Sequence, residues 1–101
     1  MHKVSHLGID IGGAHLKVIG VDKKNRVVLV DYESCAIWKG VEKLKEKFRN
    51  INNIINDNSV KCGITMSGEM CDNFKNRLIG AKILIKECNK LRFNNFFYVN
   101  S

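Results

Sequence analysis

Four residues near the start of the chain could hold a phosphate group: Asp10, Gly12, Gly13 and Lys17, within residues 8–17 (GIDIGGAHLK). Two successive glycines let backbone N–H groups turn toward an anion and let that anion approach without a Cβ clash. A carboxylate beside a phosphate repels it unless a cation lies between them. We therefore predict that Asp10 is a Mg²⁺ ligand, direct or through water, and that Lys17 supplies charge to a terminal phosphate.

The segment does not match two common nucleotide motifs. The chain has no Gly-Lys-Ser/Thr, which excludes the helix-opening phosphate loop, and residues 8–17 do not contain Gly-x-Gly-x-x-Gly. The other interpretation is a tight Gly-Gly hairpin whose Asp10 and Lys17 are simply solvated, and the pattern alone does not decide between the two.

The elements that must position these residues follow from the hydrophobic pattern. Leu7, Ile9 and Ile11 alternate with Gly8 and Asp10, which predicts a strand within residues 4–11 with Asp10 on the opposite face. Valine-rich strands are expected at 16–21 and 26–32, separated by a polar turn at 22–25, and further strands at 60–65 and 95–100. The hairpin with the glycine pair spans residues 7–21.

Two helices are expected between the later strands. The first has an apolar stripe, and so does the second, which runs from just after residue 69 to about residue 91. The stripes are Val41, Leu44, Phe48, Ile51, Ile54 and Ile55 in the first, and Phe74, Leu78, Ala81, Ile85 and Cys88 in the second. Right-handed crossovers then predict an α/β fold: a mixed five-stranded sheet, with a three-stranded antiparallel meander, two parallel strands and two crossover helices.

Size and charge limit the function. A chain of 101 residues that is 45% apolar predicts a single domain over residues 1–101, too small to enclose a two-lobed catalytic cleft. It has no apolar run long enough to cross a bilayer and no secretion signal, so we expect no membrane association and a cytoplasmic location. The net charge of +7 is better explained by solvated helix faces than by nucleic-acid binding, because basic and acidic residues alternate through 42–49.

The four cysteines do not suggest a metal site. Cys35, Cys62, Cys71 and Cys88 never form Cys-x-x-Cys, so neither a zinc ribbon nor a disulfide framework is expected. We predict reduced, mostly buried thiols.

The motif Asp-x-Gly-Gly-x-x-x-Lys at residues 10–17 resembles the first phosphate loop of the actin-like ATPase and sugar-kinase superfamily. Together with Ile-Trp-Lys-Gly at 37–40, Thr-Met-Ser-Gly-Glu-Met at 65–70, Asp72-x-Phe74 and Arg77-x-x-Gly80, it is similar to a narrower group. That group is the hydantoinase/oxoprolinase-related proteins of the tetrahydromethanopterin-linked one-carbon pathway, which include the methanofuran-biosynthesis synthase family. The resemblance spans residues 7–80 and implies the N-terminal subdomain of an actin-like, ribonuclease H-like ATPase fold.

The resemblance also implies a reaction. It is a transferase reaction that joins γ-glutamyltyramine to aminomethyl-furanmethanol diphosphate and expels pyrophosphate. Mg²⁺ would be the cofactor, with a diphosphate or ATP as the phosphorylated ligand. Since such folds bind ligands between two lobes, we expect a missing C-terminal lobe or partner chain and expect the isolated chain to be too short for activity on its own. The alternatives are a Mg-phosphate or ATP-binding fragment of a hydantoinase- or kinase-like enzyme, and a non-catalytic basic interaction domain.

Site residues carry over from the resemblance position by position. Asp10 corresponds to the metal ligand, the backbone of Gly12, Gly13, Ala14 and His15 to the phosphate contacts, and Lys17 to phosphate charge, while Thr65, Ser67 and Glu69 would face the same cleft. Glu69 is either a general base for the phenol or a charge partner of a helix N-terminus. Ala14 departs from the Thr or Ser common in the superfamily, which removes a hydroxyl contact. His15 is either a ligand contact or simply exposed.

Overall fold

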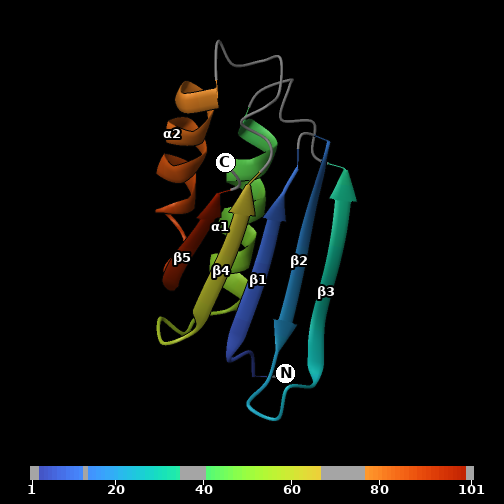
Figure 1. Ribbon diagram of the computed structural model, residues 1–101. Helices are drawn as coiled ribbons and strands as arrows, with labels where there is room; N and C mark the ends of the chain where they lie inside the picture. Colours follow the sequence, from blue (N-terminus) through green and yellow to red (C-terminus); the bar gives the residue numbers. More distant parts are fainter. Residues whose placement is uncertain (1–2, 13, 35–40, 67–76, 100–101) are drawn as a thin grey trace.

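The computed structural model describes residues 3–12, 14–34, 41–66 and 77–99. The elements are β1 (His6–Ile11), β2 (His15–Val21), β3 (Val27–Ser34), α1 (Glu42–Ile54), β4 (Lys61–Met66), α2 (Arg77–Cys88) and β5 (Asn94–Val99). They form a five-stranded sheet of order β3-β2-β1-β4-β5 (Figure 1). β1 pairs antiparallel with β2 and parallel with β4, while β3 and β5 are the edges. The mixed sheet predicted from the sequence is therefore confirmed.

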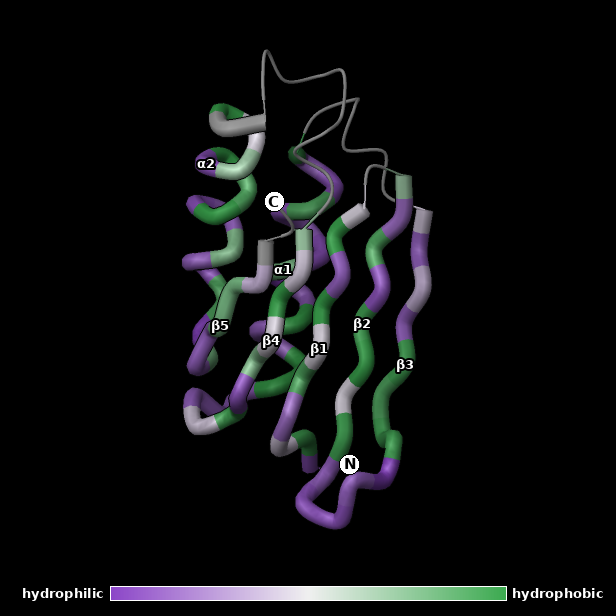
Figure 2. The backbone as a smooth tube through the Cα atoms, in the orientation of Figure 1, coloured by the Kyte–Doolittle hydropathy of each residue, from purple (hydrophilic) through white to green (hydrophobic). Residues whose placement is uncertain are grey.

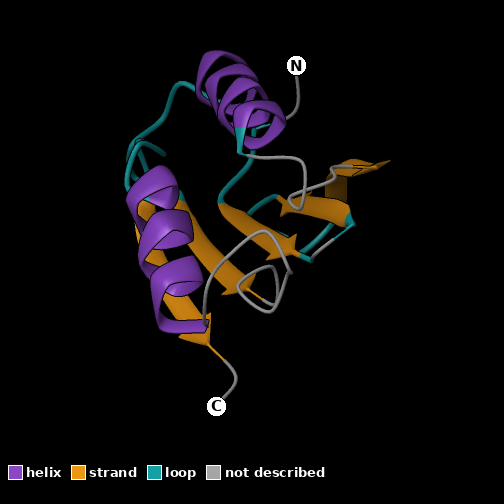
Figure 3. Ribbon diagram, turned by 90° about the horizontal axis from the view of Figure 1, so that it is seen from above, coloured by secondary structure: helices purple, strands orange, loops and turns teal. Residues whose placement is uncertain are grey.

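Both helices cover the same face of the sheet, as the view from above shows (Figure 3). Alternate residues of the three inner strands point toward the helices and are buried: Leu7, Ile9, Ile11, Leu16, Val18, Cys62, Ile64 and Met66. Leu44, Phe48 and Leu84 meet them from the helices. Hydrophobic residues accordingly alternate with more hydrophilic ones along the inner strands, while the turn between β2 and β3 is hydrophilic (Figure 2). Neither described helix is long and apolar enough to span a membrane.

The predicted stripe of α1 is largely confirmed, with one error. Leu44, Phe48, Ile51 and Ile55 are buried, but Ile54 is 57% exposed. The helix ends at Ile54, and Ile55 follows as its C-cap with an extended backbone (φ −110°, ψ 92°), so the side chain of Ile55 does not continue the helical spacing.

The predicted stripe of α2 was partly wrong. Leu84, which the prediction omitted, is the fully buried centre of this helix, with Cys88 beside it, while Ile85 is only partly buried. Three consecutive apolar residues, Ile83, Leu84 and Ile85, leave the phase of the stripe undetermined by periodicity. Phe74 and the side chain of Leu78 lie outside what the structure describes.

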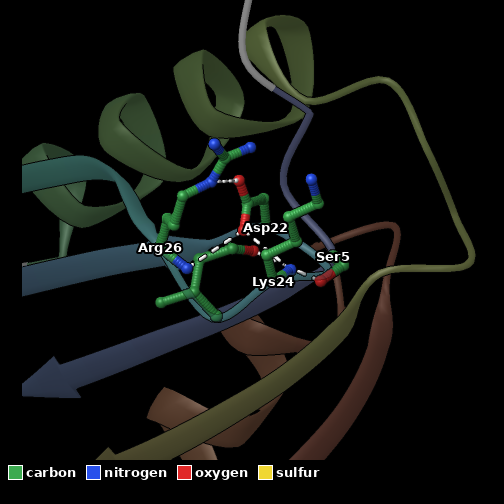
Figure 4. Close-up of polar contacts among 5 residues, drawn as sticks. Ser5, Asp22, Lys24 and Arg26 are labelled. Atoms are coloured by element: carbon green, nitrogen blue, oxygen red, sulfur yellow. Dashed lines mark hydrogen bonds and ion pairs between the residues drawn. The ribbon is translucent and has the colours of Figure 1, made fainter.

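The polar turn between β2 and β3 is held by Asp22 (Figure 4). Its Oδ1 accepts hydrogen bonds from the backbone N–H groups of Lys24 (2.9 Å) and Arg26 (3.0 Å), and its Oδ2 accepts one from Arg26 Nε at 2.8 Å. Asn25 adopts φ 60°, a left-handed conformation that asparagine tolerates better than most residues. The turn therefore fixes the antiparallel return of the chain that brings β3 beside β2.

An ionic cluster joins the edge strand β3 to α1. The Lys47 ammonium contacts Asp31 and lies 2.5 Å from Glu33 Oε2, while Lys43 Nζ lies 3.4 Å from Glu33 Oε1. These contacts pair part of the basic charge of α1 with carboxylates of β3.

Cys62 in β4 and Cys88 in α2 are free, buried thiols, as predicted. Burial raises the pKa of each to about 12. Cys35 and Cys71 lie outside the described residues.

Candidate phosphate-binding site

The glycine-containing hairpin connects β1 and β2. The Gly12 N–H donates a 2.9 Å hydrogen bond to the His15 carbonyl, which closes the hairpin and leaves Ala14 at its tip. Because this N–H already donates within the hairpin, it is not available to a phosphate. A phosphate nest would therefore use the backbone N–H groups of residues after Gly12. Ala14 is exposed at the tip, and Gly13 lies outside the described residues.

Asp10 lies at the centre of a row of residues that crosses the whole sheet. Its Cα is paired with Lys17 on β2 and with Thr65 on β4. Residues paired in this way project from the same face, and here it is the face opposite the helices, since Ile9 and Ile11 on either side of Asp10 are buried. The face predicted for Asp10 is therefore confirmed.

Thr65 fixes the Asp10 carboxylate directly. The Thr65 hydroxyl donates a hydrogen bond of 3.0 Å to Asp10 Oδ1. This bond joins β1 and β4 near their carboxyl ends, where ligands commonly bind in sheets with parallel strands. The structure thus brings together two of the residues that the sequence placed in one cleft.

Lys17 and His15 share an aromatic neighbour, Tyr32 of β3. The rings of His15 and Tyr32 stack with centroids 5.1 Å apart and planes 23° from parallel. Lys17 Nζ lies 5.7 Å from the Tyr32 ring centroid, within the range of a cation–π interaction. The sequence analysis missed Tyr32, although its alternation with the exposed Val30 places it on the sheet face opposite the helices. His15 is exposed, which is compatible with both of its interpretations, so its role stays a prediction.

The remaining predicted site residues are Ser67 and Glu69, and both lie outside the described residues. Among the residues that are described, no group of three or more His, Cys, Asp or Glu side chains is arranged to hold a metal. Mg²⁺ needs less from a protein, because it is commonly bound by one or two carboxylates together with phosphate oxygens and water. A partly exposed carboxylate held by one hydroxyl at Oδ1 fits that mode of binding.

Comparison with solved structures shows that the chain has the actin-like, ribonuclease H-like fold. Thermus thermophilus RuvC in complex with a Holliday junction substrate superposes with a TM-score of 0.61 at 12% identity, over 97% of this chain and 65% of RuvC. A protein assigned as a sugar kinase in Cytophaga hutchinsonii gives 0.56 at 21% identity, over 95% and 35%. An exopolyphosphatase of the same organism gives 0.54 at 15% identity, over 93% and 34%.

Among curated proteins, the chain is similar to (4-{4-[2-(gamma-L-glutamylamino)ethyl]phenoxymethyl}furan-2-yl)methanamine synthase of Methanocaldococcus jannaschii. The two are 31% identical over 97 residues, which is 96% of this chain and 27% of the synthase. The chain therefore spans about a quarter of the length of the relative that it matches. No protein-family model matches the chain.

Proposed function

We propose that this chain supplies the metal carboxylate and the phosphate-binding hairpin of a transferase related to the methanofuran-biosynthesis synthase. The reaction would join γ-glutamyltyramine to aminomethyl-furanmethanol diphosphate and release pyrophosphate. The observation that carries the proposal is the Thr65–Asp10 hydrogen bond, which unites the hairpin and β4 within the 97 residues that are similar to the synthase. The link to hydantoinases and to tetrahydromethanopterin stays a prediction.

Several of the described residues would each contact a bound diphosphate or its Mg²⁺ ion. Because Asp10 Oδ1 accepts the hydrogen bond from Thr65, Oδ2 would contact Mg²⁺ or one of its water ligands. Bound there, Mg²⁺ would neutralise the negative charge that grows on the departing pyrophosphate. Lys17, paired with Asp10 across the hairpin, would add a second positive charge, and Ala14 at the hairpin tip would offer backbone contacts without a side-chain hydroxyl. Glu69 is proposed either as the base for the phenol or as a helix-terminal charge.

We expect this chain to bind the diphosphate but not to catalyse the condensation by itself. The chain matches 27% of the synthase, and a single exposed row of side chains orients a ligand but excludes little water. We therefore expect the chain to bind Mg-pyrophosphate without catalysing the condensation, and expect condensation only when polypeptide equivalent to the rest of the synthase is present.

Calorimetric titration with pyrophosphate, with and without Mg²⁺, tests the binding. Asp10→Asn removes the charge that attracts the cation, so we expect at least a tenfold loss of affinity in Mg²⁺. Without Mg²⁺ we expect no loss, because the Asp10 carboxylate repels a phosphate that no cation neutralises. Thr65→Val removes one orienting hydrogen bond of about 0.5–1.5 kcal/mol, so we expect a loss of about two- to tenfold. Asp57→Asn, which changes a partly exposed loop residue at the opposite end of the sheet, is the matched control and should bind as wild type.

Two results would contradict the proposal: no binding by the wild type, or equal affinity of wild type and Asp10→Asn in Mg²⁺. Titration with ATP distinguishes this proposal from the alternative of a nucleotide-binding fragment. The alternative is supported by the fold that the chain shares with a sugar-kinase-like protein and an exopolyphosphatase. Tighter binding of ATP than of pyrophosphate would favour that alternative.

A further inference from the structure

One row of paired residues crosses the sheet at the level of Asp10. From β3 to β5 the row reads Tyr32, Lys17, Asp10, Thr65 and Tyr98. All five project from the face opposite the helices, because residues paired in this way share a face. The row therefore has charged and polar groups at its centre and one tyrosine at each edge. The two tyrosines are 60% and 61% exposed.

The rings of the two tyrosines lean toward opposite ends of the sheet. Tyr32 stacks on His15, which begins β2 beside the hairpin, with 5.1 Å between the ring centroids. The ring of Tyr98 leans the other way, since a Cβ at Gly63 would lie 3.6 Å from it. Gly63 precedes Thr65 by two residues on β4 and so lies further from the hairpin. Of the two tyrosines, Tyr32 is therefore the one beside the candidate phosphate site.

The charges of the row favour the same side for a bound diphosphate. Lys17 lies between Asp10 and Tyr32 in the row. On the other side, the neutral Thr65 separates Asp10 from Tyr98. A diphosphate that contacts Lys17 and a Mg²⁺ ion at Asp10 would therefore lie toward β2 and β3. Neighbouring strands lie about 4.8 Å apart, so Tyr32 is only about 10 Å from Asp10 along the row. Lys17 Nζ is 5.7 Å from the centroid of the Tyr32 ring.

An aromatic ring bonded to the diphosphate through one methylene group would reach Tyr32. The furan ring of the substrate in the proposed reaction is bonded to its diphosphate in this way, so it must bind close to the phosphates. The exposed ring of Tyr32 offers it a flat surface, and aromatic rings favour offset-stacked or edge-to-face contacts with one another. Ligand sites commonly combine aromatic side chains with a few polar groups that fix the orientation. Tyr32, Lys17 and Asp10 provide that combination in one row.

We propose that Tyr32, with His15 stacked on it, forms a subsite for the aromatic ring of an arylmethyl diphosphate. The subsite rests on the proposed function, because it needs a diphosphate bound between Asp10 and Lys17. Tyr32 would contact the ring and not the phosphates. It would therefore determine which diphosphates bind most tightly, while Asp10 and Lys17 would hold the group that all of them share.

Calorimetric titration in Mg²⁺ with two matched diphosphates tests the subsite. Furan-2-ylmethyl diphosphate carries the aromatic ring, and tetrahydrofuran-2-ylmethyl diphosphate carries a saturated ring with the same connectivity. We expect the wild type to bind the aromatic ligand about three- to tenfold more tightly. Tyr32→Leu should abolish this preference, whereas Tyr32→Phe, which keeps the ring, should retain it. Both ligands carry the same diphosphate, so an effect of the substitution on Lys17 cancels in the ratio of the two affinities.

Tyr98→Leu is the matched control, because Tyr98 lies in the same row and is almost equally exposed but leans away from the hairpin. It should keep the preference, and thermal melting of each variant shows whether it folds. Equal affinity of the wild type for the two ligands, or a preference that survives Tyr32→Leu, would overturn the subsite and leave the proposed function intact. Loss of the preference in Tyr98→Leu alone would also overturn it, in favour of the other edge of the row. If neither ligand binds and pyrophosphate does not bind either, both proposals fail.

Discussion

Gly20 and Gly8 are both strand glycines, yet their surroundings differ sharply. A Cβ on Gly20 would lie 3.1 Å from Leu29 Cβ and 3.2 Å from Val4 Cγ2, closer than ordinary contact, whereas Gly8 has space. Gly20→Ala forces Val4 and Leu29 apart in the core, so we expect a loss of about 1–3 kcal/mol. Gly8→Ala restricts the unfolded chain without a clash, so we expect a gain of about 0.4–1 kcal/mol.

Urea unfolding followed by circular dichroism measures both free energies under the same conditions. Equal effects of the two substitutions would contradict the packing difference around these glycines.

Asp10 and Thr65 show how far single residues could be predicted. The alternation of Leu7, Ile9 and Ile11 determined the face of Asp10, because neighbouring strand residues point to opposite sides. The bond from Thr65 depends on the parallel pairing of β1 with β4, which residues near Asp10 do not encode. The resemblance to a family suggested that the two share a cleft. The contact of Tyr32 with His15 and Lys17 depends on β3 lying beside β2, and was missed.

At the scale of elements, β3 and α1 are joined by charges that titrate. Hydrogen bonding and attraction from Lys47 hold the pKa of Glu33 below its ordinary value of 4.5, and hydrogen bonds to Asp31 and Glu33 raise that of Lys47. A lowered carboxyl pKa stabilises the folded state above about pH 4.5, and this stabilisation disappears as the pH falls through the folded pKa. Lys47→Met should therefore reduce stability at pH 7, and its difference from wild type should shrink at lower pH.

Urea unfolding of wild type and Lys47→Met between pH 3 and pH 7 checks this expectation. Asp22, whose pKa is lowered mainly by the Arg26 backbone N–H, and Asp57, lowered mainly by the Ser59 hydroxyl, lose stabilisation over the same range. The two carboxylates are present in wild type and in Lys47→Met alike, so their contributions cancel when the two free energies of unfolding are subtracted. A difference that is constant down to pH 3 would show that Lys47 acts through packing of its aliphatic stem alone.

The elements themselves were well predicted from the sequence, because short alternating strands and one clear helical stripe carry strong periodic signals. The five strands lie within a few residues of their predicted bounds, and the turn at 22–25 has the polar residues that its hydrogen bonds use. The buried side of α2 was less predictable, since the consecutive apolar residues Ile83, Leu84 and Ile85 point to three different sides of the helix. Which of them faces the sheet is decided by the tertiary position of the helix.

At the scale of the whole molecule, Cys62 and Cys88 report on the integrity of the core between sheet and helices. Thiolates, not thiols, react with disulfide reagents, and a pKa of about 12 leaves almost none at pH 8. In a variant with Cys35→Ser and Cys71→Ser, we expect both remaining thiols to react with Ellman's reagent at the rate at which the chain opens, and rapidly in urea. Fast reaction of either thiol in the native protein would contradict the burial described for both.

Two regions distant in sequence must meet before the Asp10 carboxylate has its partner. Asp10 and Thr65 are separated by 55 positions, and their strands pair only after α1 has crossed over the sheet. The β1–β2 hairpin is local and can form early, whereas the parallel pairing of β1 with β4 must first overcome the entropy of closing a long loop. The candidate site is therefore completed late in folding, and a ligand that bridges Asp10 and Thr65 would act as a clasp that slows the separation of β4 from the hairpin.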